Sequence, residues 1–393
     1  MNKIAKVIVV FVCLLFLTGC KGSSRVEQSQ NLLTQEEICW TELREIAAIY
    51  EDIYKRGLTE GTLQTLEVKQ KIIECLGEAG YSVSDTENEV NMVNSEPVRA
   101  FCEAAKRGED AEATLYLIMD DGGIVRYDLT AEKGNINIVR SSLLWDGLEM
   151  KNGCYEEFDA YTWDFTEKGY LFLEEYHPEG YDGYPGEIGI RVISLDQSLR
   201  ELNQKYVAPI GYGGNNLLIT EWNEDDYTAL DFYDLYELLY RQKYGCNAPG
   251  SETWEGKELE IPAQEFENIV QEYFDIESTL LREVLPYNAD NQTYRYRPRT
   301  IYDMEMPYGP YPEIVSYEIL EGGLLKLTIE AVWVIEKMDC ALTSELTIRP
   351  LENGGFQYVS NHVVSKEGSM EQTWYCPRLT DEEWGELFGE IQE

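Results

Sequence analysis

Leu324-Leu325-Lys326-Leu327-Thr328-Ile329-Glu330-Ala331-Val332-Trp333-Val334-Ile335, residues 324–335, is the stretch that best defines the fold of this 393-residue chain. Polar residues at Lys326, Thr328 and Glu330 separate apolar residues at alternate positions. Because successive strand side chains point to opposite faces of a sheet, this period of two predicts a long strand with one buried face. That face would carry Leu325, Leu327, Ile329, Ala331, Trp333 and Ile335.

The same alternation, with turn residues between the runs, predicts a four-stranded antiparallel meander over residues 313–320, 324–335, 340–349 and 356–364. A helix that starts at Pro262 and stays apolar on one face through Val284 precedes it. A helix followed by a long antiparallel meander resembles the cystatin-like or NTF2-like arrangement. We therefore expect a helix-plus-meander domain over residues 257–393, separated from what precedes it by the Gly- and Pro-rich segment 244–257.

Residues 34–245 predict a second domain of helices and antiparallel strands, with a possible subdivision near residue 110. Thr34 and Glu37 form a capping-box pattern at the start of the first helix, which stops at Gly57. Further helices are expected over residues 62–79, 97–107, 197–205 and 230–243, and strands over 114–119, 123–129, 135–141, 159–165, 170–176 and 188–195. The chain is therefore expected to be an α+β protein.

The N-terminus carries Lys3 and Lys6, an apolar run from Val7 to Leu17, and the sequence Leu17-Thr18-Gly19-Cys20. This segment resembles a bacterial lipoprotein signal peptide, with Leu17 to Cys20 as its lipobox. The resemblance implies that residues 1–19 are removed, that Cys20 carries acyl chains, and that residues 20–33 tether the protein to the extracytoplasmic face of the cell membrane. The layout also resembles that of uncharacterised Firmicutes surface lipoproteins. A transmembrane helix and an ordinary cleaved secretory signal are the alternatives. The apolar run is too short for the first, because a membrane span needs about 20 apolar residues.

Composition limits the partners of the body. The chain has 73 acidic and 32 basic residues, a formal charge of −41, and loss of the signal would make it two units more negative. Such a charge repels nucleic acid, so no nucleic-acid role is expected. Its 28 Tyr, 8 Trp and 11 Phe supply material for a packed core and argue against disorder.

Seven cysteines remain after Cys13 and Cys20 are set aside, and none lies at the spacing of a metal site. We expect a disulfide between Cys340 and Cys376, which flank the C-terminal sheet, and more weakly one between Cys39 and Cys102. Buried free thiols are the alternative for the others. No metal or cofactor is predicted.

Two segments are candidate ligand sites. The loop around Tyr176, Tyr181 and Tyr184 combines aromatic rings with acids, a pattern typical of sugar recognition. The alternative is a connecting loop whose tyrosines pack as a lid. Arg295, Arg297 and Arg299 would share one strand face and could hold an anion or an acidic partner. The alternatives for these arginines are edge protection and internal pairing with acids. The acidic stretch 221–234 lacks the pattern of a calcium loop and is expected to be a solvated face.

Catalytic motifs are absent from the sequence, which contains only two histidines, His177 and His362. We expect His362 to pack on a sheet face. The leading hypothesis is a lipid-anchored binding or interaction protein of the cell envelope, with an envelope protein or glycan as partner. Under this hypothesis the protein is not expected to be an enzyme. The alternatives are a carboxylate-dependent glycan hydrolase and an accessory subunit of a membrane complex.

Overall fold

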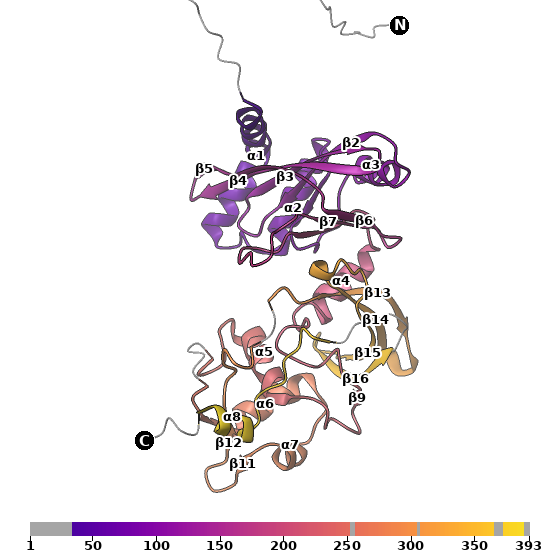
Figure 1. The fold of residues 1–393 in the computed structure, drawn as a ribbon. Helices are drawn as coiled ribbons and strands as arrows, with labels where there is room; N and C mark the ends of the chain where they lie inside the picture. The colour runs from indigo at the N-terminus through magenta and orange to yellow at the C-terminus, as the bar shows by residue number, and fades with distance from the viewer. Residues whose placement is uncertain (1–33, 252–255, 305–306, 365–371, 389–393) are drawn as a thin grey trace, which may run out of the picture.

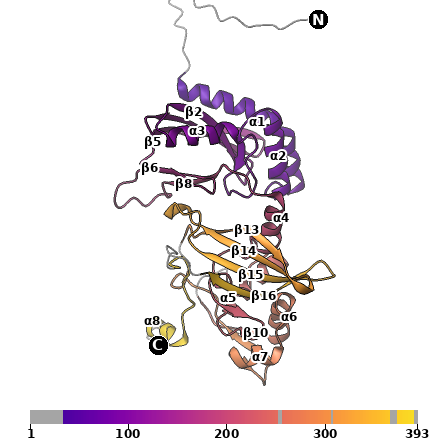
Figure 2. The same cartoon turned by 90° about the vertical axis from the view of Figure 1, so that its right-hand side faces the viewer.

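The computed structural model describes residues 34–251, 256–304, 307–364 and 372–388. The chain folds into an N-terminal half, residues 34–195, and a C-terminal half, residues 207–388, with helix α4 (Gln197–Tyr206) between them (Figures 1 and 2). Helices and mostly antiparallel strands make up both halves, which confirms the expected α+β class.

A five-stranded sheet in the order β1-β2-β3-β4-β5 forms the centre of the N-terminal half. Only β1 runs parallel to its neighbour; the other pairs are antiparallel. Helix α1 starts with the predicted capping box, in which Thr34 and Glu37 exchange hydrogen bonds. The elements are α1 (Gln35–Glu60), α2 (Leu66–Glu78), β1 (Val83–Asp85), α3 (Glu96–Lys106), β2 (Ala111–Ile118), β3 (Ile124–Glu132), β4 (Asn135–Asp146) and β5 (Glu149–Asp159).

Both faces of this sheet are covered. Tyr116 and Ile118 pack into a core with α1 and α2, whereas Leu115 and Leu117, one position away, pack into a core with α3. The period of two on β2 thus sends alternate side chains into two separate layers. The second layer also contains a three-stranded sheet of β6 (Thr162–Phe165), β7 (Tyr170–Glu174) and β8 (Glu187–Arg191).

The C-terminal half contains the predicted meander. Strands β13 (Tyr311–Ile319), β14 (Leu325–Val332), β15 (Thr343–Pro350) and β16 (Phe356–Val364) follow one another across the sheet, and β9 (Trp222–Asn223) completes it. On β14, Leu327, Ile329 and Ala331 are fully buried as expected. Glu330 on the opposite face is also buried, because Lys168 of the N-terminal half pairs with it. The strand ends earlier than predicted, before the short 3-10 helix η2 (Val334–Glu336).

Six further elements pack against this sheet in one core. They are α5 (Phe232–Tyr244), β10 (Leu259–Pro262), α6 (Ala263–Tyr273), α7 (Ser278–Val284), β11 (Tyr287–Asn288) and β12 (Thr293–Tyr296). The 3-10 turn η1 (Glu321–Gly323) and α8 (Asp381–Phe388) lie outside this core. The hydrophobic core runs continuously from Tyr206 to Trp374 and includes α5 and α6. The boundary predicted at residues 244–257 is therefore corrected: the cores divide near α4.

Strands β7 and β8 form the junction with β13, β14 and η2. Tyr170 and Phe172 pack with Val332 in a small apolar cluster. Beside it, the Tyr170 hydroxyl donates to Glu313 Oε1 at 2.9 Å, and Arg191 forms an ion pair with the same carboxylate. Within the described residues, no helix combines the length and apolar character that a membrane span requires.

Candidate functional site

Two adjoining cavities of about 410 and 420 Å³ lie between the halves, and we call them together the junction cleft. Glu87, Asn88 and Tyr311 line both cavities, which places these residues where the two meet. The first cavity has an aromatic wall and the second a polar wall. Volumes of this size and a position between domains are typical of small-molecule sites.

Arg200 of α4 is the best-fixed residue of the polar wall. Its Nε donates to Asn91 Oδ1 at 3.1 Å and its Nη1 to the Asn88 carbonyl at 2.6 Å, while Glu313 Oε1 lies 3.8 Å from Nη1. The side chain is only 4% exposed, yet Nη2 is buried without a hydrogen-bond partner among the described residues. The guanidinium is therefore held rigidly with one donor uncommitted.

Asn203 and Gln204 repeat this pattern on the same helix. Positions three and four residues apart share one helix face, so both side chains follow Arg200 along the cavity wall. Asn203 Oδ1 and Gln204 Nε2 are buried and, among the described residues, have no hydrogen-bond partner. Native proteins satisfy most buried polar atoms, so a cavity wall on which three residues each keep such an atom unpartnered is a candidate binding wall.

Carboxylates also line the polar cavity. Lys69 Nζ lies 2.7 Å from both Asp120 Oδ1 and Glu89 Oε2, so these two acids are already paired. Burial alone would lower the pKa of Lys69, but its hydrogen bonds to these acids raise it, and the lysine stays charged. Glu87 lies where the two cavities meet; partial burial and the negative charge of Asp120 raise the pKa of its carboxyl.

Tyrosines form the aromatic wall, with Tyr127 and Tyr311 inside and Tyr184 and Tyr308 at the opening. Burial raises the pKa of Tyr127 and Tyr311, so both phenols stay neutral. Tyr308 has φ 62°, a conformation rare for a bulky residue and common at functional sites. Trp333 Nε1 donates a hydrogen bond to the Tyr308 carbonyl at 3.0 Å.

The predicted tyrosine loop contributes only one of its three candidates to the cleft. Tyr184 lines the aromatic cavity and is 81% exposed. Tyr176 and Tyr181 are also exposed, but the first contacts Tyr161 and the second lies against His177, with ring centroids 3.8 Å apart. The structure therefore brings Tyr184 to a cavity and leaves its two neighbours on the loop surface.

Arg295 and Arg297 lie close together, as their alternation predicts, but face acids of the same chain. Both contact Asp381 of α8 and Glu258, and Arg297 also lies over the Trp384 ring, 4.4 Å from its centroid. This is the internal pairing that the sequence left open as an alternative. The pairs neutralise much of the positive charge that an acidic partner would need.

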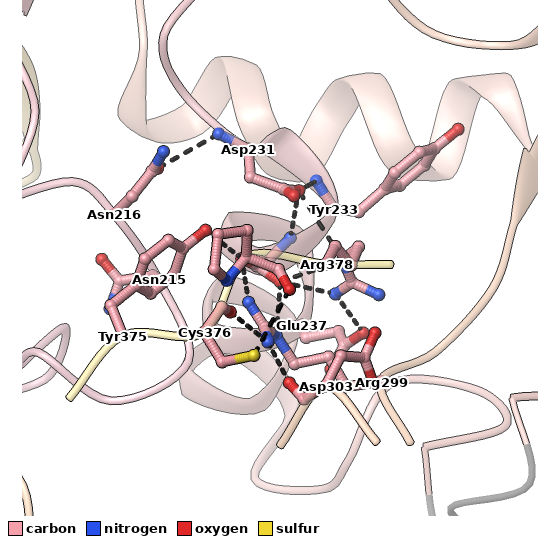
Figure 3. Close-up of polar contacts among 12 residues, drawn as sticks. Asn215, Asn216, Asp231, Tyr233, Glu237, Arg299, Asp303, Tyr375, Cys376 and Arg378 are labelled. Carbon is pink, nitrogen blue, oxygen red and sulfur yellow. Dashed lines mark hydrogen bonds and ion pairs between the residues drawn. The ribbon is translucent and has the colours of Figure 1, made fainter. Parts of the chain in front are cut away.

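Arg299 departs from the predicted shared face, because β12 ends at Tyr296 and the chain turns inward. Its guanidinium binds Asp234 of α5 in a bidentate pair, with Nε to Oδ1 at 2.8 Å and Nη2 to Oδ2 at 2.6 Å. Arg378 joins the same carboxylate and also reaches Glu237. Figure 3 shows Arg299 and Arg378 converging on α5 beside Glu237 and Tyr375.

A cavity of about 230 Å³ adjoins this cluster. All three nitrogens of the Arg299 guanidinium have acceptors in the protein, since Nη1 also donates to the Cys376 carbonyl at 2.8 Å. The acidic stretch that contains Asp234 is thus not wholly a solvated face. The paired charges are typical of a structural clamp, in contrast to the uncommitted atoms of the junction cleft.

The predicted Cys340–Cys376 disulfide is corrected, because both cysteines are free thiols. Cys340 Sγ contacts Thr343 Oγ1 and the Leu342 carbonyl, whereas Cys376 Sγ contacts the Pro377 carbonyl. Cys39 and Cys102, the weaker pair, are also free and buried. Cys340 and Cys376 flank the same sheet in sequence, but their sulfur atoms are not bonded to each other.

Other predicted features fall outside the cleft. His362 is corrected: it is exposed rather than packed, with its Nδ1 3.1 Å from a Glu221 carboxylate oxygen. In the described part of the chain, no group of three or more His, Cys, Asp or Glu side chains is placed to hold a metal ion. Residues 1–33, with the signal peptide, Cys20 and the tether, lie outside the described residues.

Sequence reasoning missed Arg200, Asn203, Gln204 and Glu87. The helix containing the first three is predicted, but Arg200 looks like any exposed helix arginine. Its burial depends on the 88–91 loop, more than a hundred residues away in sequence. The spacing of polar residues on α4 could have suggested a polar stripe, but not what it faces.

Comparison with known proteins matches the chain to a sequence family. A family described as being of unknown function, DUF6070, matches residues 36–378. No curated protein and no solved structure matches. The cystatin-like or NTF2-like resemblance of the C-terminal part therefore stays a prediction.

Proposed function

The chain belongs to this DUF6070 family, and we propose that it is a lipid-anchored, extracytoplasmic binding protein that holds a small polar ligand in the junction cleft. One observation carries the proposal: Arg200, Asn203 and Gln204 line one cavity, and each has a buried polar atom (Nη2, Oδ1 and Nε2) that is unpartnered among the described residues. Each such atom costs about 1–3 kcal/mol when left unsatisfied. A polar ligand that hydrogen-bonds to them would offset this cost.

The anchor rests on the lipobox-like Leu17-Thr18-Gly19-Cys20. Acylation of Cys20 would keep the body at the membrane surface, where a binding protein meets ligands from outside the cell. Cys20→Ala should move the protein from the membrane fraction to the soluble fraction, measured by fractionation and immunoblotting. A variant that stays fully membrane-bound would contradict lipid anchoring.

Ligand binding is tested with the detergent-solubilised full chain. We expect at least one of four ligand classes (neutral saccharides, amino acids, short peptides or dicarboxylates) to raise the melting temperature. The double variant Asn203→Ala with Gln204→Ala should remove this increase, because it deletes two uncommitted groups. Gln197→Ala, an exposed position on the same helix, is the matched control and should keep it. No increase with any class, or an increase that survives the double variant, would refute the site.

A second candidate, carboxylate-dependent glycan hydrolysis, is favoured by Glu87. Its raised pKa suits a general acid, and Asp120 lines the same cavity. Under this hypothesis Glu87→Gln abolishes the release of reducing ends from an oligosaccharide but leaves binding intact. Glycan hydrolysis is ruled out if the wild-type protein releases no reducing ends, or if Glu87→Gln releases as many as the wild-type protein.

A further inference from the structure

The two walls of the junction cleft differ in chemistry in a way that restricts the ligand. On the polar side, the guanidinium of Arg200 can only donate hydrogen bonds, whereas the amides of Asn203 and Gln204 both donate and accept them. Donors and acceptors therefore follow one another along a single helix face. A ligand that satisfies all three must offer both kinds of group.

Charged ligands match this wall poorly. A carboxylate or phosphate can only accept, so it would leave the amide oxygens of Asn203 and Gln204 without a donor, and it would meet Glu87, Glu89 and Asp120 in the same cavity. An ammonium group can only donate, so it would leave Arg200 and Gln204 unsatisfied and would face the fixed positive charge of Arg200. Neighbouring hydroxyl groups donate and accept without net charge, and they avoid both penalties.

The aromatic wall supplies the complementary half of the site. Tyr184 and Tyr308 are 81% and 51% exposed at the opening of the same cavity. Aromatic rings present a negative face, which attracts the polarised C–H groups on the flat side of a pyranose ring. Aliphatic amino acids and dicarboxylates lack such a flat, C–H-rich face.

The cavities meet at Glu87, Asn88 and Tyr311, so a single ligand can extend from one wall to the other. Asn88 itself is committed to the protein, since Nδ2 donates to the Gly189 carbonyl at 2.9 Å and Oδ1 accepts from Arg191 N at 2.8 Å. The meeting point is therefore a fixed edge between two subsites.

We propose that the junction cleft binds a neutral saccharide of two or more units, with one ring against Tyr184 and Tyr308 and the hydroxyls of a neighbouring unit bonded to Arg200, Asn203 and Gln204. This inference rests on the proposed binding function and specifies the ligand class of the same site.

Titration calorimetry with the solubilised full chain tests the ligand class. The neutral probes are maltotriose, cellotriose and triacetylchitotriose; the charged counterparts are trigalacturonic acid and the chitosan trimer. We expect at least one neutral trisaccharide to bind about tenfold more tightly than both charged ones. The inference is overturned if a charged probe binds more tightly than the neutral ones, or if no saccharide binds. The proposed function survives that result if another ligand class still depends on Asn203 and Gln204.

Variants at the opening test the stacking subsite. Tyr184→Ala should weaken binding of the neutral trisaccharide about tenfold, whereas Tyr184→Phe should retain it, because the ring rather than the hydroxyl makes the contact. Tyr181→Ala changes an exposed tyrosine of the same loop that does not line the cavity, and should bind normally. Equal loss in Tyr184→Phe and Tyr184→Ala, or none in either, overturns the stacking geometry. Unchanged melting temperatures without ligand show that the variants are folded.

Discussion

Single residues in this molecule fall into two groups that look alike in sequence. Arg299 and Arg200 are both buried arginines, at 7% and 4% exposure. Arg299 meets a buried carboxylate and backbone carbonyls, whereas Arg200 keeps one nitrogen uncommitted among the described residues. The first arrangement stabilises the fold, and the second is what a binding site requires. Only three-dimensional partners distinguish them.

Asp234→Ala should unfold the C-terminal half at much lower denaturant concentration. Asp234 is fully buried and pairs with both Arg299 and Arg378, so its loss leaves two buried cations without their main partner. Breaking a buried pair in this way costs about 3–5 kcal/mol. Urea unfolding followed by tryptophan fluorescence measures it. Asp290→Ala on an exposed turn is the control, and an equally small loss in both variants would contradict the clamp.

Thiol labelling should separate the cysteines by burial. Only the thiolate reacts, and burial raises the pKa of Cys102 to about 12 and also raises that of Cys39. Exposed Cys246 should therefore react with iodoacetamide first in the native protein, and Cys39 and Cys102 only after unfolding. Peptide mass spectrometry of non-reduced digests reads the result. A linked Cys340–Cys376 peptide, or early labelling of Cys102, would contradict the structure.

Secondary-structure elements were predictable where their pattern is local. The alternation of residues 324–335 and the Gly-rich turns around it identified β13 to β16 with small errors at the ends. Strand β5 was missed because its sequence, Glu149–Asp159, is mostly polar and half-exposed, so it shows no apolar alternation. Strand β9 has only two residues and pairs with β16 far away in sequence. Elements without a buried face leave little local signal.

Gly169→Ala tests the turn of the β6–β7 hairpin, which joins Thr162–Phe165 to Tyr170–Glu174. Gly169 has φ 92°, and an added Cβ would lie 2.2 Å from Ile193 Cβ. We expect the backbone strain and the overlap together to cost about 2–4 kcal/mol. Gly354→Ala has φ 88° but no atom within 4 Å, so it isolates the backbone cost of about 1–2 kcal/mol. Equal losses in thermal unfolding would show that the overlap is relieved.

The whole molecule is organised by contacts that join distant parts of the sequence. Helix α4 touches the 88–91 loop of one half and β13 of the other, and α5 completes a core with the strands of the meander, which come much later in the sequence. The Gly- and Pro-rich segment 244–257 predicted a boundary that the core crosses. Composition marks a flexible connection, but it carries no information about which elements pack together across it. For the same reason the cleft between the halves could not be predicted.

Glu313→Ala should uncouple the two halves. Glu313 is 3% exposed. Across the junction it forms an ion pair with Arg191 and accepts a hydrogen bond from the Tyr170 hydroxyl. Its removal leaves Arg191 buried without its carboxylate, at a cost of about 3 kcal/mol or more. Calorimetric unfolding should then split into two transitions. Glu318→Ala, exposed on the same strand, is the control, and a single unchanged transition in both variants would contradict the coupling.

Asn88 has a consequence for how relatives of this chain can diverge. Its left-handed backbone (φ 55°) presents the carbonyl to Arg200, while its amide side chain joins β8. One residue thus shapes the ligand wall and fastens the framework, so a replacement would disturb affinity and rigidity together. We expect evolution to retune ligand preference at Tyr184 and Tyr308 instead, where loop residues can be exchanged without loosening the scaffold.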